Sequence, residues 1–559
     1  MKGFKQNLRD EAYVVRGHSD VTILERPSKA TTTRNRWLGL GLGTAGFVVF
    51  FFWTYLFGLH VHWGNADLLR GLLQGSDMAH GNVLLNHWFS GSDSYWAVDS
   101  YLFALGVLAF GTKIVVAHYV AAFVWAGVIV VAATVATTGL RRGQYWAAVA
   151  TVVITLGLPS GLFASFLSAS MTHIATALVV LLAFLGLSQG RFGWGWCAAV
   201  TMLAAGLLSD PLIVAYGIVP TLIVGVFDSI RSRKWLTGLS TASASVASIV
   251  LAVVVRTIAD HLGTYQIVPG TSSAPLIQML HNVRALLPDS LALLGLGRRF
   301  SASHVPWELE LFRVFGALTI AAGLAVGLAC LLLNLISGQP RVNVQGMAAR
   351  SEASFRLNDL LVLGTVGVVV TYVALRADAG GLRYLPVGVV FASILGAMLV
   401  GQMVGLLALS RLKYLTAGLA MILLGNAACA GFFLSRPSPV SPFPLLSNFL
   451  VSHHLERGVG DYWSSAPITA YSSGKVTVRQ VVPSSQGGIS PYLVLAKSTW
   501  YFGKFQFLVY DVSTLTGRLI REAPGFPFAD VDRTYREGPF RIVVWRHATS
   551  MAALARGGP

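Results

Sequence analysis

The sequence predicts a polytopic α-helical membrane protein that ends in a small α/β domain. Of the 559 residues, 54% are hydrophobic and only 12% are charged, whereas soluble domains carry roughly 25% charged residues. Many separate runs reach the roughly 20 apolar residues that a helix needs to cross a bilayer. Residues 435–559 differ from this composition, because they alternate aromatic and β-branched residues with polar ones, as strands do.

The first 36 residues are polar and of mixed charge. A cleavable signal peptide would place its apolar core much nearer to the start of the chain. We therefore expect residues 1–36 to form a short cytoplasmic tail without a packed core of its own.

Eleven apolar runs within residues 37–434 are predicted to span the membrane. They are expected to be helices, because backbone polar groups in lipid must be hydrogen-bonded within their own segment. Two of them meet at Asp210-Pro211, where a tight hairpin is expected. The runs are roughly 37–58, 113–139, 144–160, 171–188, 194–209, 211–228, 236–256, 311–335, 358–376, 385–409 and 413–434.

Basic residues predict the orientation of these spans. The formal charge is +17, and Lys and Arg gather on the cytoplasmic side of membrane proteins. An odd number of spans then puts the N-terminus inside, and the C-terminus outside with the loops 59–112 and 257–310. The sequence has no basic and aromatic stripe of the kind that binds nucleic acid, so the charge is assigned to topology and to anionic lipid. The orienting residues are Arg34, Arg36, Arg141, Arg142, Arg191, Arg231, Arg233, Lys234, Arg341, Arg350, Arg356, Arg411 and Lys413.

Nucleotide-binding motifs are not found in the sequence. It has no P-loop, no dinucleotide-binding glycine fingerprint and no GxSxG nucleophile elbow. Its cysteines, Cys197, Cys330 and Cys429, lie singly in apolar runs, which supports neither a disulfide framework nor a zinc site. If the protein transfers a group, we expect a donor that is carried by a lipid instead of a cytosolic nucleotide.

Residues 435–559 are predicted to form an outward-facing α/β domain, which can hold an acceptor, a partner or the rim of a cavity. A linker rich in Pro and Ser, SRPSPVSPFP at 435–444, separates it from the last span. The strand-like runs are KVTVRQVV (475–482), YLVLAKSTWYF (492–502), FQFLVYDV (505–512) and FRIVVWRH (540–547).

The first outer loop gathers acids and histidines beside the membrane. We expect Asp77, after a short helix predicted at 66–74, to act as a general base toward an acceptor hydroxyl, or alternatively to cap a helix that begins near Met78. His80 shares its helix face, but two ligands are weak evidence for a metal site, so a divalent metal stays possible and no cofactor is certain. The loop carries Asp67, Asp77, Asp93, Asp99, His60, His62, His80 and His87.

Asp99 is the second candidate for a catalytic carboxylate, or else a helix N-cap. Asp93 and Asp99 flank the stretch SYWAV, whose Tyr95 and Trp96 either stack on a sugar or belong to the interfacial aromatic belt, and the belt is favoured for Trp96.

Asp210 is a candidate substrate-binding residue, because an acid at membrane depth is functional by default. The alternative is a turn in which Pro211 starts the next helix. His173 opens another span on the outer side, where it either binds substrate or, as is more usual, is a satisfied interfacial histidine.

Arginines on the outer side are candidates for binding the phosphate of a lipid carrier. Arg383 and Tyr384 lie in GGLRYLP, just before the tenth span, and Arg298 and Arg299 lie in GLGRRF. A guanidinium presents a rigid fork of donors to phosphate oxygens. The alternative is an anchor to any lipid headgroup, but arginines that break the charge rule favour phosphate binding.

The layout resembles the C-type superfamily of integral membrane glycosyltransferases. Where that family places an Asp-Glu pair, Met78 follows Asp77 here, which weakens a metal or two-carboxylate scheme. The motifs that carry the resemblance are SDMAHGNVL with Asp77, VDSYLFALGVLAFGTK with Asp99, Asp210-Pro211, RYLP at 383–386, and DYWSSAPITAYSSGKVTV at 461–478, which is similar to the YW-x-A-x-x-T stretch of some bacterial members.

The resemblance implies a polyprenyl-phosphate-linked sugar donor and an envelope glycan, lipid or protein as acceptor. It also implies an active site that faces outward from a bacterial inner (plasma) membrane. Asp77 would be the base, with Asp99 second, and Arg383 with Arg298 or Arg299 would stabilise the leaving phosphate in an inverting displacement. Two alternatives stay open. One is a transporter or lipid-carrier flippase, which broken helices and polar residues at mid-depth would favour, and the other is a non-catalytic envelope assembly protein of the same architecture.

Overall fold

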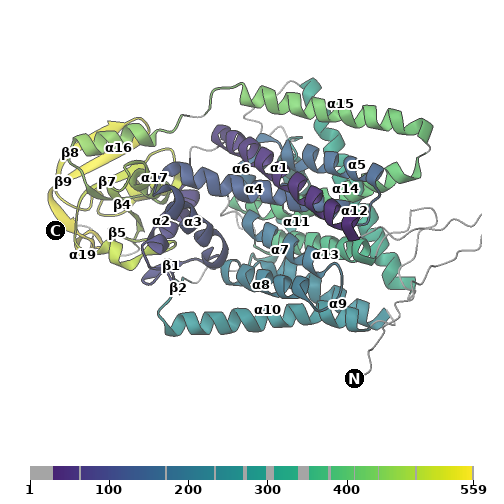
Figure 1. Ribbon diagram of the computed structural model, residues 1–559. Coiled ribbons are helices and arrows are strands. Elements are labelled where there is room, and N and C mark those ends of the chain that lie inside the picture. Colours follow the sequence, from purple (N-terminus) through teal and green to yellow (C-terminus); the bar gives the residue numbers. More distant parts are fainter. Residues whose placement is uncertain are drawn as a thin grey trace, which may run out of the picture. The chain divides into compact units, whose positions relative to one another are not determined.

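The computed structural model describes residues 29–61, 64–169, 173–231, 235–268, 273–296, 307–337, 352–375, 379–407, 409–438, 440–484 and 487–556. The chain divides into two compact units, Met1–Val49 and Phe50–Pro559. The described residues of the first unit belong to α1 (Lys29–Val61), which continues into the second unit. All other elements belong to the second unit (Figure 1).

The predicted fold class, a helical membrane protein with a C-terminal sheet domain, is confirmed. Among the described residues, seven helices are long and apolar enough to cross a membrane. Each of the eleven predicted runs coincides with helical structure, although several of these helices are short. The long helices are α1, α4 (Ile114–Thr137), α10 (Trp235–His261), α12 (Trp307–Ser337), α13 (Glu352–Leu375), α14 (Leu385–Leu406) and α15 (Leu409–Leu434). The shorter ones are α5 (Arg142–Val152), η2 (Val153–Gly157), α7 (Ile174–Leu187), α8 (Trp194–Ser209), η3 (Val214–Ile218) and α9 (Val219–Arg231). Two further helices, α6 (Gly161–Leu167) and α11 (Leu276–Leu293), lie outside the predicted runs.

The third predicted span is broken. The helix formed by α5 and η2 bends by 90° into α6. Pro159 lies in the break, where it has no N–H to donate to a helical hydrogen bond. Ser160 then starts α6, because its hydroxyl accepts a hydrogen bond from the backbone N–H of Phe163.

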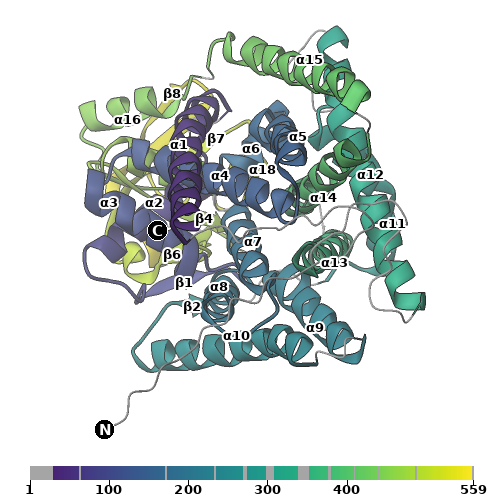
Figure 2. The ribbon, with the colours of Figure 1, turned by 45° about the vertical axis from the view of Figure 1, so that its right-hand side comes forward.

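Helix α14 lies at the centre of the membrane part. Within the apolar window of this span, 94% of the residues are buried inside the protein, as expected for a helix that is apolar on all sides. It packs against α5, α12 and α13 (Figure 2). Gly396 permits the close approach of α12, because a Cβ at this position would lie 2.7 Å from the backbone oxygen of Thr319.

The first outer loop is largely ordered into short elements. Its first helix is longer than predicted, because it continues through Gly75, so Asp77 lies in its last turn and does not cap a new helix. Gly75 is needed for close packing, since a Cβ there would lie 2.4 Å from the Cβ of Phe103. The elements are α2 (Ala66–Ala79), β1 (Trp88–Ser90), the π-turn η1 (Trp96–Ser100) and α3 (Tyr101–Phe110).

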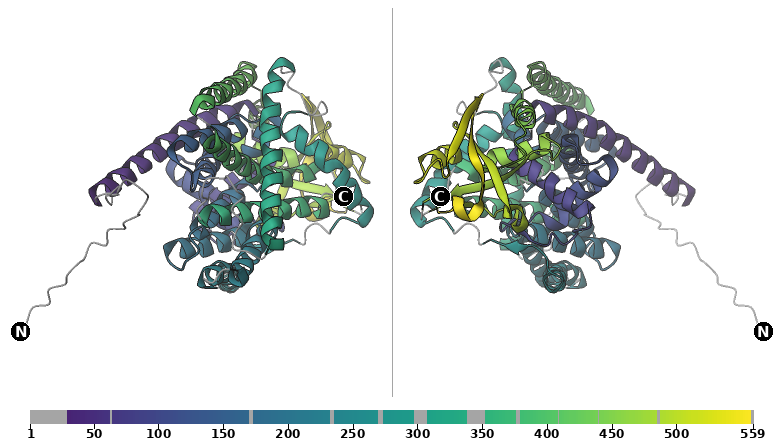
Figure 3. Two further views of the ribbon diagram at one scale, coloured as in Figure 1. Left: turned by 90° about the vertical axis from the view of Figure 1, so that its right-hand side faces the viewer. Right: turned by 90° about the vertical axis from the view of Figure 1, so that its left-hand side faces the viewer.

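The C-terminal domain is built on a six-stranded mixed sheet with the order β5-β4-β3-β7-β9-β8. The strands β4, β3 and β7 run parallel, and the outer pairs are antiparallel. Figure 3 shows the last strands of this sheet in yellow. The elements are α16 (Phe443–Ser452), β3 (Arg457–Gly460), α17 (Tyr462–Tyr471), β4 (Thr477–Pro483), β5 (Ile489–Pro491), β7 (Lys504–Asp511), α18 (Leu515–Glu522), β8 (Val531–Glu537), β9 (Phe540–Ser550) and α19 (Met551–Leu554).

One of the four predicted strands is wrong. The runs 475–482, 505–512 and 540–547 coincide with β4, β7 and β9, but most of 492–502 is not a strand. It forms the two-residue strand β6 (Ala496–Lys497) and the 3-10 turn η5 (Ser498–Tyr501). Leu495, Ala496 and Tyr501 are nevertheless buried, so the apolar pattern of this run reflects packing instead of strand pairing.

A small three-stranded sheet joins the two outer loops to the C-terminal domain. Its order is β2-β1-β6, with β2 (Gln266–Ile267) from the second outer loop and β6 from the C-terminal domain. Close to it, α17 of the C-terminal domain packs against α2 (Figure 1). The segments that surround the candidate site are therefore held together by main-chain pairing as well as by side chains.

Candidate active site

Charged side chains from four distant segments meet where several helices begin or end. Asp93 lies close enough to His173, Asp210 and Arg383 for all three charges to act on its carboxylate. The ring of His173 lies 5.4 Å from the ring of Tyr384, measured between centroids. We call these five residues the acid–arginine cluster.

Asp210 and His173 form a buried pair within this cluster. Asp210 Oδ2 lies 2.8 Å from His173 Nδ1 and accepts a hydrogen bond of 2.9 Å from the hydroxyl of Tyr216. The backbone N–H of Leu212 donates to Asp210 Oδ1. His173 Nε2 is buried and has no hydrogen-bond partner among the described residues. Asp210 therefore fixes the ring of His173 and leaves its second nitrogen available to a ligand.

The backbone near the cluster adopts unusual conformations at two residues. Tyr95 and His173 have φ values of 57° and 67°, in the left-handed region that non-glycine residues rarely occupy. The backbone N–H of Tyr95 donates to the backbone oxygen of Ser209, and the hydroxyl of Ser94 donates to the backbone oxygen of Leu208. These bonds fasten the first outer loop to the end of α8, which places Asp93 beside Asp210.

Arg383 has no ionic partner among the described residues. It lies in the 3-10 turn η4 (Ala379–Tyr384), directly before α14. Its Nη2 donates a hydrogen bond of 3.2 Å to the hydroxyl of Tyr384. Its Nε is buried without a partner, and no described carboxylate lies within 4.0 Å of its guanidinium nitrogens. A charge that is partly removed from water without compensation is costly, and an anion would relieve this cost.

Asp93 is a half-buried carboxylate with a perturbed proton affinity. Burial raises the pKa of Asp93 above its usual range, while the positive charges of His173 and Arg383 partly lower it. The hydroxyl of Ser92 donates a hydrogen bond of 3.0 Å to it. A reachable carboxylate with a raised pKa is suited to accept a proton from a reacting hydroxyl.

A second carboxylate, Asp67, lies at the rim of the cluster. The charges of Asp67 and Arg383 both act on the hydroxyls of Tyr95 and Tyr492, whose pKa values are raised by burial. The hydroxyl of Tyr462 donates a hydrogen bond to Asp67. The C-terminal domain thus contributes Tyr462 and Tyr492 to the surroundings of Arg383.

Asp77, the base expected from the sequence, lies in a different set of contacts. Its carboxylate accepts hydrogen bonds of 2.5 Å from Asn82 Nδ2, 2.7 Å from Trp88 Nε1 and 3.1 Å from Lys497 Nζ. Trp88 belongs to β1 and Lys497 to β6, so Asp77 helps to hold the small sheet against α2. The ring of the nearby His80 is hydrogen-bonded to the backbone oxygen of Ser76 at the end of α2.

The other site residues predicted from the sequence do not join the cluster where the structure describes them. Asp99 is buried within η1, and Ser100, not Asp99, is the N-cap of α3. Trp96 is 4% exposed, which is too little for the expected aromatic belt, and its Nε1 donates to the backbone oxygen of Val83. Arg298 and Arg299 lie outside the described residues.

A metal site is not evident in the described part of the chain. It contains no group of three or more His, Cys, Asp or Glu side chains that could hold a metal ion. The pair Asp77 and His80 does not acquire a third such ligand there.

Three members of the cluster are candidate site residues in the sequence, and two others were given no preferred functional role there. Asp210, Arg383 and Tyr384 were candidate substrate-binding residues, and the structure brings them together. Asp93 was considered only as a neighbour of Asp99, and His173 as an interfacial histidine. Both residues lie beside apolar runs on the same predicted side of the membrane, and this was the signal in the sequence that they could lie near Asp210 and Arg383.

No protein-family model and no curated protein matches the chain. ArnT from Cupriavidus metallidurans, bound to undecaprenyl phosphate, is similar with 13% identity and a TM-score of 0.47 over 90% of this chain and 97% of that chain. The oligosaccharyltransferase from Archaeoglobus fulgidus, in complex with Zn and sulfate, is similar with 11% identity and a TM-score of 0.43 over 84% of this chain and 68% of that chain. A likeness at these values concerns the fold alone and gives no residue a role.

Proposed function

We propose that the protein is a membrane glycosyltransferase that moves a sugar from a polyprenyl-phosphate carrier to an acceptor hydroxyl. The observation that carries the proposal is the guanidinium of Arg383, with its unpartnered Nε and no described carboxylate within 4.0 Å. Its fork of donors fits the oxygens of a phosphate. The hydroxyl of Tyr384 and Nε2 of His173 belong to the same cluster and can bind further phosphate oxygens.

Asp93 is the proposed general base. It accepts the proton of the acceptor hydroxyl while that oxygen attacks the anomeric carbon of the sugar. The bond between the anomeric carbon and the phosphate oxygen breaks, and the carrier leaves as a polyprenyl monophosphate whose charge Arg383 stabilises. This single displacement inverts the configuration of the sugar. Asp93 takes the place of Asp77 in the proposal, because Asp77 already accepts hydrogen bonds from Asn82, Trp88 and Lys497.

The reaction is proposed to take place at the outer face of a bacterial inner membrane. The positive-inside rule puts the first outer loop and the C-terminal domain on that side. A carrier that is anchored in lipid would keep its tail among the helices while its phosphate reaches Arg383. Tyr492 of the C-terminal domain offers an aromatic ring and a hydroxyl to the acceptor, which is a glycan, a lipid or a protein.

The base is tested with Asp93→Asn and its matched control Asp77→Asn, each purified and reconstituted with a polyprenyl-phosphate sugar. The measurement is the release of polyprenyl monophosphate that depends on an added acceptor. We expect Asp93→Asn to lower the rate about 10²-fold or more, and Asp77→Asn to stay within a few-fold of wild type.

If Asp77→Asn lowers the rate much more than Asp93→Asn does, the base is Asp77. Wild-type rates in both would exclude either carboxylate as the base. Movement of the carrier across the bilayer without sugar transfer would favour a flippase instead.

A further inference from the structure

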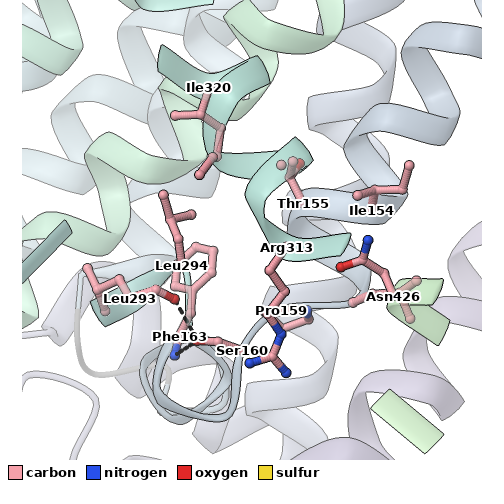
Figure 4. Close-up of a pocket in the computed structure, with 13 residues that line it drawn as sticks. Ile154, Thr155, Pro159, Ser160, Phe163, Leu293, Leu294, Arg313, Ile320 and Asn426 are labelled. Carbon is pink, nitrogen blue, oxygen red and sulfur yellow. Dashed lines mark hydrogen bonds between the residues drawn. The ribbon is translucent and has the colours of Figure 1, made fainter. Parts of the chain in front are cut away.

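We propose that the buried side chain of Arg313 marks a second phosphate site, which takes the headgroup phosphate of a membrane lipid. The site lies in a pocket between the break at Pro159, the end of α11, and helices α12 and α15 (Figure 4). The acid–arginine cluster is built from other segments and shares no residue with this pocket. The proposal concerns binding and does not depend on the proposed transfer reaction.

The pocket is small and opens to the outside. The space inside it that a water-sized sphere can occupy is about 20 Å³. In Figure 4 the side chain of Arg313 runs from α12 toward Pro159 and Ser160 at the break of the third span. Apolar side chains of α11 and η2, among them Leu293, Leu294 and Ile154, cover the remaining walls.

Arg313 has no ion-pair partner among the described residues. It is 8% exposed, and its Nε has no hydrogen-bond partner in this part of the chain. The thiol of Cys429 and the carboxylate of Glu310 act on its charge, but among the described residues no carboxylate oxygen lies within 4.0 Å of its guanidinium. An ionised side chain inside a membrane-spanning segment is costly unless it is paired, and such residues are functional by default.

The backbone around Arg313 leaves room for the guanidinium. Gly295, at the end of α11, has a φ of +82°, and a Cβ at this glycine would lie 2.5 Å from Nη1 of Arg313. The same Cβ would lie 3.0 Å from the Cβ of Ser160. A larger residue at position 295 would therefore fill the space between Arg313 and Ser160, which the glycine keeps open.

The polar groups near Arg313 are already engaged with the backbone. The hydroxyl of Ser160 donates to the backbone oxygen of Leu293, and Asn426 Nδ2 donates to the backbone oxygen of Phe312. They hold the walls of the pocket and do not neutralise the arginine. The missing partner is an anion, and the planar fork of a guanidinium matches phosphate oxygens in particular.

A lipid is the expected source of this phosphate. Exposed apolar side chains lie on both helices that border the pocket, namely Leu311 and Leu318 on α12 and Met421 and Leu424 on α15. These helices are candidate membrane spans of which only 22% and 28% are buried inside the protein. Acyl or prenyl chains can therefore lie along α12 and α15 while the headgroup approaches Arg313 from the open side of the pocket.

The test counts bound lipids by native mass spectrometry of the full-length protein in detergent with a polyprenyl monophosphate. Wild type is expected to bind two molecules, Arg313→Gln and Arg383→Gln one each, and the double variant none. Arg284→Gln, which changes an exposed arginine on α11, is the matched control and should bind two.

The Arg383→Gln arm keeps the test valid even if Arg313→Gln does not fold. One retained molecule in Arg383→Gln supports the second site, and none overturns it. Phosphatidylglycerol is then added to wild type as a competitor. If it displaces only the molecule that Arg313→Gln fails to bind, the site takes lipid phosphates in general, which would support the proposal. If inorganic phosphate binds at Arg313 and neither lipid does, the lipid source is wrong.

Discussion

Arg383 has no ion-pair partner among the described residues, and burial raises the pKa of Asp93. The two residues lie close enough to influence each other, yet they do not form an ion pair. An ion pair would satisfy both groups and leave neither for a ligand. Their separation instead leaves an anion-binding donor on one side and a proton acceptor on the other, which is the division that transfer from a phosphate carrier requires.

The raised pKa of Asp93 predicts how the rate depends on pH. A general base works in its ionised form, so kcat/KM should fall as the pH drops through the pKa of Asp93. Because burial raises this pKa from the usual 3.8, the acid limb should lie above pH 3.8 and should be absent from the residual activity of Asp93→Asn. Arg383→Gln removes a cation that lowers the pKa, so its acid limb should move to higher pH. A pH–rate profile that is identical in wild type and Asp93→Asn would contradict the assignment.

At the scale of elements, the site depends on how short segments are capped and joined. Asp461 begins α17, the helix that packs against α2 and carries Tyr462 to the rim of the cluster. Its carboxylate accepts hydrogen bonds from the backbone N–H groups of Trp463, Ser464 and Asp511. The same side chain thus caps α17 and ties it to the end of β7.

Removing this carboxylate should destabilise the C-terminal domain. We expect Asp461→Ala to lower the free energy of unfolding by about 2 kcal/mol, because it deletes an N-cap and leaves buried N–H donors unsatisfied. Asp461→Asn keeps one acceptor oxygen and should lose clearly less. Thermal unfolding of the full-length variants in detergent gives the comparison, and equal midpoints for Asp461→Ala and wild type would refute the capping role.

The sequence allowed the helices to be predicted, but not the way in which their ends meet. Long apolar runs are a strong signal, and each of them coincides with helical structure. The run 492–502 has the composition of a strand, but its pairing depends on β1 of the first outer loop, which no local pattern reveals. The contacts of Asp77 are likewise not visible in the local sequence, since one partner is Trp88 and another is Lys497, far along the chain. Asp77 was therefore preferred to Asp93 as the candidate base.

At the scale of the whole molecule, the proposed function requires that the first outer loop and the C-terminal domain lie on the outer side of the membrane. The distribution of Lys and Arg predicts this orientation. Lys475 is exposed in the C-terminal domain, and Lys413 is exposed near the start of α15, on the predicted cytoplasmic side. These two residues offer a matched pair of reporters.

The orientation is tested by single cysteines in a cysteine-free background. Lys475→Cys should react with a membrane-impermeant maleimide in intact spheroplasts, whereas Lys413→Cys should react only after the membrane is opened. Protection of Lys475→Cys together with labelling of Lys413→Cys would reverse the topology and place the site on the cytoplasmic side.

The most direct test of the proposed function is an experimental structure of the protein with a bound polyprenyl monophosphate. We predict that its phosphate lies within hydrogen-bond distance of Arg383 Nε and of the hydroxyl of Tyr384, with Asp93 facing the open side of the phosphate. A phosphate bound elsewhere, with the acid–arginine cluster empty at saturating ligand, would contradict the central role of Arg383.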